Sequence, residues 1–204
     1  MKFLYWVGGL ILLVLVLCVV FLRGGAYDVA ADEPHWQVTR SMMEKVRSAS
    51  IERRSAHIEV PPLGDATLIT SGAGNYDAMC ASCHLQPGVE ATEMSRGLYP
   101  APPNFMTRPP EDAAAAFWVI KHGIKMSGMP AWGQSMDDEY VWGLVAFLKE
   151  LHDMSADRYR ELVEASGGHQ HGGSESGMEA EGSAPGHDDS PVEDDHSKAP
   201  PHQH

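Results

Sequence analysis

The most apolar stretch of the chain lies at its start, where Phe3–Leu22 forms twenty consecutive residues without a charge. At about 1.5 Å of rise per residue, a helix of this length spans the roughly 30 Å hydrocarbon layer of a membrane. The pattern predicts a membrane-spanning anchor over residues 1–23. A cleaved secretory signal is the alternative, since small residues follow at Val29-Ala30-Ala31, but its apolar core is usually only about 7–15 residues long. Leu17 stands where a lipoprotein signal needs a small residue before Cys18, so no lipid is expected there.

Apolar residues then recur among charged ones from Asp32 to about His57, after two acids and Pro34, which together favour the start of a helix. Pro61-Pro62 ends this pattern. Residues 24–64 are therefore predicted to be an amphipathic stalk helix followed by a linker. Packing of this helix on its own domain is favoured over a position on the membrane surface.

Between residues 65 and 165 the apolar spacing is helical, and no alternating run is long enough for a strand. The prediction is a small, loop-rich, all-α domain with helices at 68–82, 111–123, 137–151 and about 155–165. The third helix is expected to start at Ser135, with acids at 137–139 in its first turn, near the positive end of the helix dipole.

Residues 166–204 are Gly, Ser, Pro, His and acid, with eight acids and one lysine. Such a segment buries too little apolar surface to offset its ordering entropy, so a disordered tail is predicted. Weak binding of copper, nickel or zinc by its histidines is the less favoured function. The net charge of −13 and the absence of a basic cluster exclude nucleic acid as a partner.

The sequence Cys80-Ala-Ser-Cys83-His84 carries the chemistry. Two thiols three residues apart can each add to a vinyl group of one haem, and the adjacent imidazole then lies under the iron. A thioredoxin-like redox pair would need a βαβ setting, and a zinc site would need a second ligand pair that Cys18 cannot supply. We therefore expect one covalently bound haem c.

Four stretches between residues 65 and 155 extend this motif: GAGNYDAMCASCH, GLYPAPPNF, FWVIKHGIKMSGMPAWG and VWGLVAFLKEL. Together they resemble a class I cytochrome c of the single-haem, membrane-anchored bacterial type. The resemblance implies thioether bonds at Cys80 and Cys83, with His84 and Met129 as the axial iron ligands. It also implies that the Pro103 carbonyl accepts a hydrogen bond from the His84 ring, with Pro102 as the alternative. The first and last helices of the domain would cross at Gly72, Tyr76, Leu144 and Phe147.

Other residues compete for the distal position. Met126 is the main rival because it lies three residues before Met129, and Met106, Met136 and His122 are weaker candidates. Met129 is favoured because Pro130 follows it. Lys121 and Lys125 flank His122 and offer a small positive patch for docking.

A His/Met haem has both axial positions filled, which favours a carrier of single electrons in a respiratory chain over an enzyme. The alternatives are an electron-transfer subunit of a larger membrane oxidoreductase and, less favoured, a haem enzyme with an open distal site. The partners would be redox proteins, including a membrane oxidase or reductase. The family resemblance places the haem domain in the bacterial periplasm, held to the inner membrane by a single span with its amino end in the cytoplasm.

Overall fold

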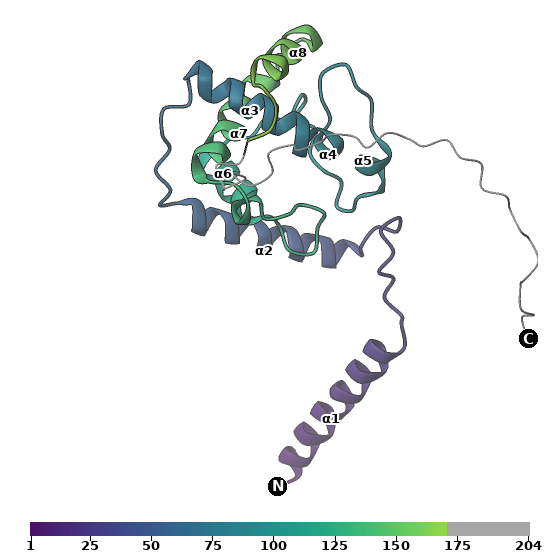
Figure 1. Cartoon of the computed structure of the whole chain (residues 1–204). Coiled ribbons are helices and arrows are strands. Elements are labelled where there is room, and N and C mark those ends of the chain that lie inside the picture. The colour runs from purple at the N-terminus through teal and green to yellow at the C-terminus, as the bar shows by residue number, and fades with distance from the viewer. Residues whose placement is uncertain (171–204) are drawn as a thin grey trace, which may run out of the picture. The chain divides into compact units, whose positions relative to one another are not determined.

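The structure is a computed structural model that describes residues 1–170. Within these residues every regular element is a helix and no strand occurs, which confirms the all-α prediction (Figure 1). The longest helix among the described residues is α1, Lys2–Arg23, whose 22 residues are long and apolar enough to cross a membrane. All its side chains, including that of Cys18, are exposed.

The core of the domain is the crossing of α3, Ala66–Met79, with α7, Asp138–Leu151. Glycines face each other at the crossing: a Cβ atom on Gly72 would lie only 2.0 Å from the carbonyl oxygen of Gly143. The rings of Tyr76 and Phe147 pack beside this point with their centroids 5.3 Å apart. The predicted crossing is therefore present, and Gly143 is the partner that the sequence analysis missed.

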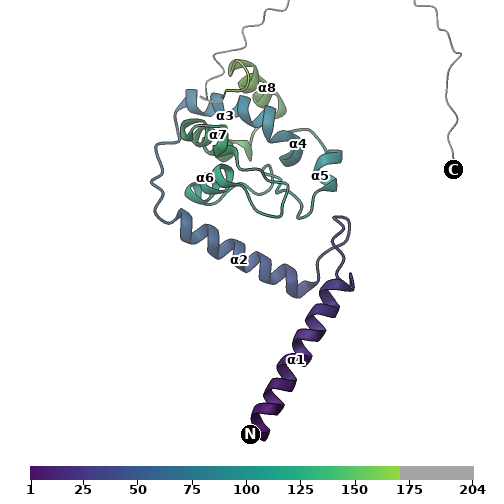
Figure 2. The ribbon, with the colours of Figure 1, turned by 60° about the horizontal axis from the view of Figure 1, so that its bottom comes forward.

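Helix α6, Ala113–His122, lies between α7 and α2, Gln37–Ser55 (Figure 2). Asp112 caps α6 by accepting hydrogen bonds from the backbone N–H groups of Ala114 and Ala115. The stalk helix α2 thus packs on its own domain, as favoured from the sequence, and it does so through α6.

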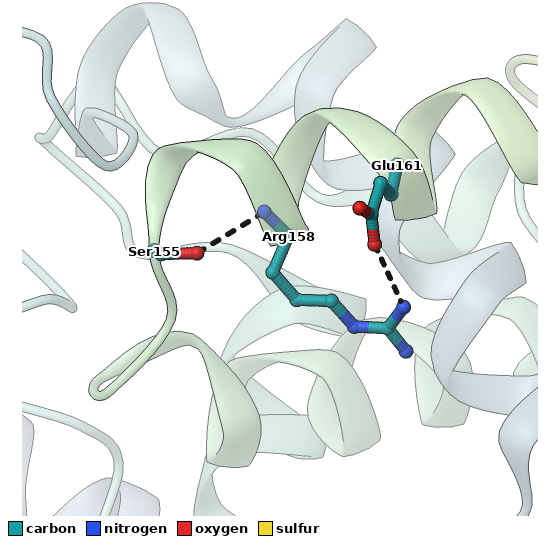
Figure 3. A network of polar contacts seen from close by, with 3 residues as sticks. All are labelled: Ser155, Arg158 and Glu161. Atoms are coloured by element: carbon teal, nitrogen blue, oxygen red, sulfur yellow. Dashed lines mark hydrogen bonds and ion pairs between the residues drawn. The ribbon is translucent and has the colours of Figure 1, made fainter.

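Helix α8, Ala156–Ala165, packs against α3 through a buried tyrosine, Tyr159, whose hydroxyl donates to Asp77 Oδ1 at 2.9 Å. The helix starts at Ser155, whose hydroxyl accepts a hydrogen bond from the backbone N–H of Arg158 (Figure 3). The Arg158 guanidinium in turn pairs with Glu161 at 3.2 Å. Ser155 therefore caps α8 by satisfying one of the backbone N–H groups of its first turn.

Two of the predicted helices differ from the structure in their boundaries. The helix expected at 68–82 is two helices, α3 and α4, Ala81–His84, because the chain turns at Cys80. Helix α7 does not start at Ser135, whose backbone N–H donates to Trp132 and ends a 3-10 turn, η1, Trp132–Gln134. That turn and the five-residue helix α5, Glu93–Gly97, were not predicted, because segments this short carry no readable periodicity.

The disordered tail was predicted from Ser166, and this boundary is wrong for its first residues. The backbone N–H of Gln170 donates to Asn75 Oδ1 at 2.8 Å, and the Ser166 hydroxyl lies so close to Gly74 that a Cβ there would clash with it. Residues 166–170 therefore pack on α3. Residues 171–204, with most of the histidines considered for metal binding, lie outside the described residues.

Candidate functional site

The Cys-x-x-Cys-His segment folds as one helical turn. Both backbone N–H groups of Cys83 and His84 donate to the Cys80 carbonyl, at 3.1 and 2.8 Å. Residues three apart lie on the same side of such a turn, so the two thiols lie on one side of it, with the imidazole next to them. Both cysteines are half-buried and neither forms a disulfide. Burial raises the pKa of the Cys80 thiol to about 12, and the neighbouring Cys83 adds to the shift.

The His84 ring is fixed by two neighbours. Its Nδ1 lies 2.9 Å from the carbonyl oxygen of Pro103, and its face stacks on Phe105 with ring centroids 4.6 Å apart. Burial lowers the pKa of the imidazole, and the hydrogen bond to Pro103 opposes that shift. Because a carbonyl only accepts, Nδ1 carries the proton, which leaves the Nε2 lone pair free for a metal.

The chain leaves the motif through a strained residue. Leu85 has φ 68° and ψ 173°, a region that is almost reserved for glycine. Its carbonyl accepts a 2.6 Å hydrogen bond from the hydroxyl of Tyr76, which is fully buried. Tyr76 therefore holds the turn after His84 in addition to packing at the helix crossing, a contact that no sequence pattern indicates.

Met129 is carried by a closed loop that follows α6. Gly123 ends the helix at φ 64°, and a Cβ there would lie 2.7 Å from the carbonyl oxygens of Met129 and Pro130. The backbone N–H of Ile124 donates to the Met129 carbonyl at 3.2 Å. The Ser127 hydroxyl donates to the Ile124 carbonyl at 2.7 Å and accepts from the Met129 N–H at 3.2 Å. The loop is thus held at both ends and across its middle.

These pieces surround one cavity of about 820 Å³, within the range of roughly 300–1,000 Å³ that is usual for cofactor sites. Its walls include every site residue expected from the sequence: Cys80, Cys83, His84, Pro103 and Met129. The remaining lining is largely apolar and includes residues of α6, η1 and α7, namely Ile120, Trp132, Leu144 and Leu148. The donor set and the apolar lining fit a haem: two thiols for attachment, an imidazole and a thioether for iron.

The competing ligands lie elsewhere. Met126 is 87% exposed, Met136 is buried in the core, and neither they nor Met106 and His122 line the cavity. Met79, directly before Cys80, does line the cavity, although the sequence pattern did not indicate it as a ligand.

The expected positive docking patch is weakened by an ion pair. Lys121 Nζ lies 2.6 Å from Asp138 Oδ1, so its charge is neutralised locally, while Lys125 is exposed. Within residues 1–170 no cluster of three or more His, Cys, Asp or Glu side chains could hold a metal ion.

The family model for subunit III of cbb3-type cytochrome c oxidases matches residues 67–148. These residues form a class I c-type cytochrome domain. The match begins in α3 and ends in α7, so it spans the crossing, the motif and the Met129 loop of this cytochrome domain. The family implies haem c and electron transfer. Neither the curated proteins nor the solved structures include a match to the chain.

Proposed function

We propose that the protein is a membrane-anchored electron carrier that holds one haem c through thioether bonds to Cys80 and Cys83. In this proposal His84 and Met129 are the two axial ligands of the iron, and the chain passes single electrons along a respiratory chain. The observation that carries the proposal is that one cavity is lined by both cysteines, by His84 and by Met129.

When bound, the haem supplies a one-electron couple at its iron. The residues of the chain tune that couple. The Pro103 carbonyl orients the His84 ring and increases its basicity, a soft thioether at Met129 favours ferrous iron, and the apolar lining disfavours the extra positive charge of ferric iron. All three properties suit a carrier that reacts only by electron exchange.

The partner is proposed to be a membrane oxidase complex, since the matching family is named for a subunit of cbb3-type cytochrome c oxidases. The chain would then be an electron-transfer subunit or a tethered donor to such a complex. A free-standing shuttle is the second arrangement. Purification in a mild detergent separates them: a subunit is expected to co-elute with oxidase haems and oxygen consumption, whereas a shuttle elutes alone.

The proposed location is the outer face of a bacterial inner membrane. Helix α1 would anchor the chain with its amino end in the cytoplasm and the haem domain in the periplasm. We expect the full chain to stay with the membrane fraction after washing with high salt and carbonate, and to keep its original amino terminus. Recovery of a soluble protein that begins near residue 32 would instead show a cleaved signal.

The ligation is tested by optical spectra of the purified protein, oxidised and reduced, with a pyridine haemochrome assay. We expect a c-type spectrum, one haem per chain, no response to carbon monoxide, and the weak long-wavelength band of a methionine-ligated ferric haem. That band should disappear in Met129→Ala and persist in Met126→Ala and Met79→Leu. A high-spin spectrum that shifts with carbon monoxide would contradict a closed carrier and favour an open, reactive iron.

A further inference from the structure

Part of the cavity wall comes from outside the matched domain. The stalk helix α2 ends twelve residues before the family match begins at residue 67, yet Glu44, Arg47 and Ile51 line the cavity. These three residues follow a spacing of three and four, so they form one face of the helix. The stalk therefore closes one side of the site as well as linking the domain to α1.

Within residues 1–170, some charged side chains around the cavity have an ion-pair or hydrogen-bond partner, and others have none. Glu44 pairs with Arg40 on its own helix at 3.2 Å, and Asp112 is engaged in capping α6. The other charged groups on the wall, besides the His84 ring, are Arg47, Arg108 and Glu111. Among the described residues the side chains of these three make no ion pair or hydrogen bond with one another or with any other group. Arg47 is half-buried, whereas Arg108 and Glu111 are exposed.

A half-buried guanidinium without a nearby carboxylate is unfavourable in free energy, because it loses water contacts and gains no attraction to an opposite charge. The group proposed to fill this cavity carries two carboxylate side chains on an otherwise apolar ring. Arginine is the side chain best suited to a carboxylate, because its planar fork can form two parallel hydrogen bonds. Arg47 is less exposed to solvent than Arg108, so its attraction to a neighbouring carboxylate would be screened less and would be stronger.

We infer that Arg47 of the stalk helix binds a carboxylate side chain of the haem, so that α2 forms part of the haem site. The inference rests on the proposed function. A positive charge at this position disfavours the ferric state and therefore raises the reduction potential. It also keeps the paired carboxylate ionised to lower pH.

The test is the reduction potential of the full-length, detergent-purified protein as a function of pH between 5 and 9. Arg47→Gln and Arg47→Met remove the charge and keep much of the stem, and Arg47→Lys keeps the charge without the fork. Arg53→Gln, on the same helix at an exposed residue that does not line the cavity, is the matched control. Haem content is measured for each variant, so that potentials are compared only between loaded proteins.

We expect both neutral variants to have a lower potential than the wild type above the carboxylate titration. In both, the pH-dependent step should move upward by about one to three pH units, the usual effect of losing a nearby opposite charge. The curve of potential against pH for Arg47→Lys should lie between those of the neutral variants and that of the wild type. The curve for Arg53→Gln should superimpose on that of the wild type.

Neutral variants whose curves superimpose on that of Arg53→Gln would overturn the inference. If only one neutral variant binds haem, its curve alone is compared with the control. If neither binds haem, the curve of Arg47→Lys is compared with that of the wild type, and superposition of these two curves overturns the inference. A wild type without a c-type spectrum or without the methionine band would instead overturn the proposed function, so the two failures are distinguishable.

Discussion

Ser127 connects the two ends of the loop that carries Met129. Its hydroxyl donates to the Ile124 carbonyl and accepts from the Met129 N–H, so one oxygen satisfies two backbone groups. The thioether of a methionine is a weak ligand on a flexible side chain, and its position depends on the backbone that carries it. Ser127 is therefore a positioning residue for the proposed iron ligand.

We predict that Ser127→Ala weakens the bond between Met129 and the iron more than it weakens the fold. Removing the hydroxyl leaves two backbone groups without their partner and should cost about 1–3 kcal/mol, concentrated in this loop. The measurement is the temperature at which the methionine band disappears, compared with the temperature at which the helical circular dichroism is lost. The first should fall further than the second.

Ser135→Ala is the control for this experiment, because that hydroxyl makes only a 3.4 Å contact with the Trp132 carbonyl and is exposed. A methionine band that melts at the same temperature in Ser127→Ala and in the control would show that the loop does not depend on the hydroxyl.

At the scale of whole elements, the domain depends on how closely α3 approaches α7. The gap at Gly72 has no room for a single carbon, since a Cβ would lie 2.0 Å from the Gly143 carbonyl oxygen and 2.9 Å from Phe147 Cβ. Backbone atoms cannot move aside as a flexible side chain can, so any larger residue must push the helices apart.

We predict that Gly72→Ala destabilises the domain by about 3 kcal/mol or more, despite the better helix propensity of alanine. Gly97→Ala in α5, where a Cβ would meet nothing within 4 Å, should leave stability unchanged or slightly improved. Both values come from denaturant unfolding followed by circular dichroism. Equal stability of the two variants would mean that the helices cross less tightly.

The helices also show which parts of the fold the sequence predicts and which it does not. Long helices with a regular apolar spacing were predicted well: the range 137–151 agrees with α7 to within one residue, and only the proposed start at Ser135 is wrong. The break at Cys80 and the strained Leu85 were not, because the apolar spacing carries no signal for a change of backbone angle. The Leu85 carbonyl accepts a hydrogen bond from Tyr76, nine residues earlier, and the spacing does not indicate this bond either. The short helix α5 has too few residues to show a period.

For the site, the family resemblance indicated five residues, and all five line the cavity. The part played by α2 was missed. Periodicity indicates that a helix has an apolar face, but it does not indicate what that face covers. Arg47 also reads in the sequence as one of several solvated basic residues of the stalk, and only the packing of α2 on α6 distinguishes it.

At the scale of the whole molecule, stability depends on pH through buried tyrosines. Tyr159 is 3% exposed, and burial, with the neighbouring Asp77, raises the pKa of its hydroxyl above the ordinary value. The folded protein therefore keeps this proton at a pH where the unfolded chain has released it. Its contribution to stability is complete below the unfolded pKa, about 10, and is lost as the pH rises above it.

We predict that the free energy of unfolding falls between pH 9 and pH 11, and that this fall is smaller in Tyr159→Phe. The difference is limited to about 1.4 kcal/mol for each pH unit above the unfolded pKa. At pH 8 the variant should be less stable by about 1 kcal/mol, because the hydrogen bond to Asp77 is lost. Tyr140→Phe, at a half-buried residue of α7, is the control. An identical fall in both variants would exclude Tyr159 as its source.

The packing of α2 on α6 also affects where the molecule can be divided. Helix α2 ends at Ser55 and the family match starts at residue 67, so a soluble fragment cut at the domain boundary would contain every proposed ligand and still lack a wall of its cavity. The side of the cavity that Arg47 lines would then face bulk water. Potentials and electron-transfer rates measured on such a fragment would describe a more solvated haem than that of the intact chain. A fragment that begins before Gln37 would keep the whole of α2 and with it this wall of the cavity.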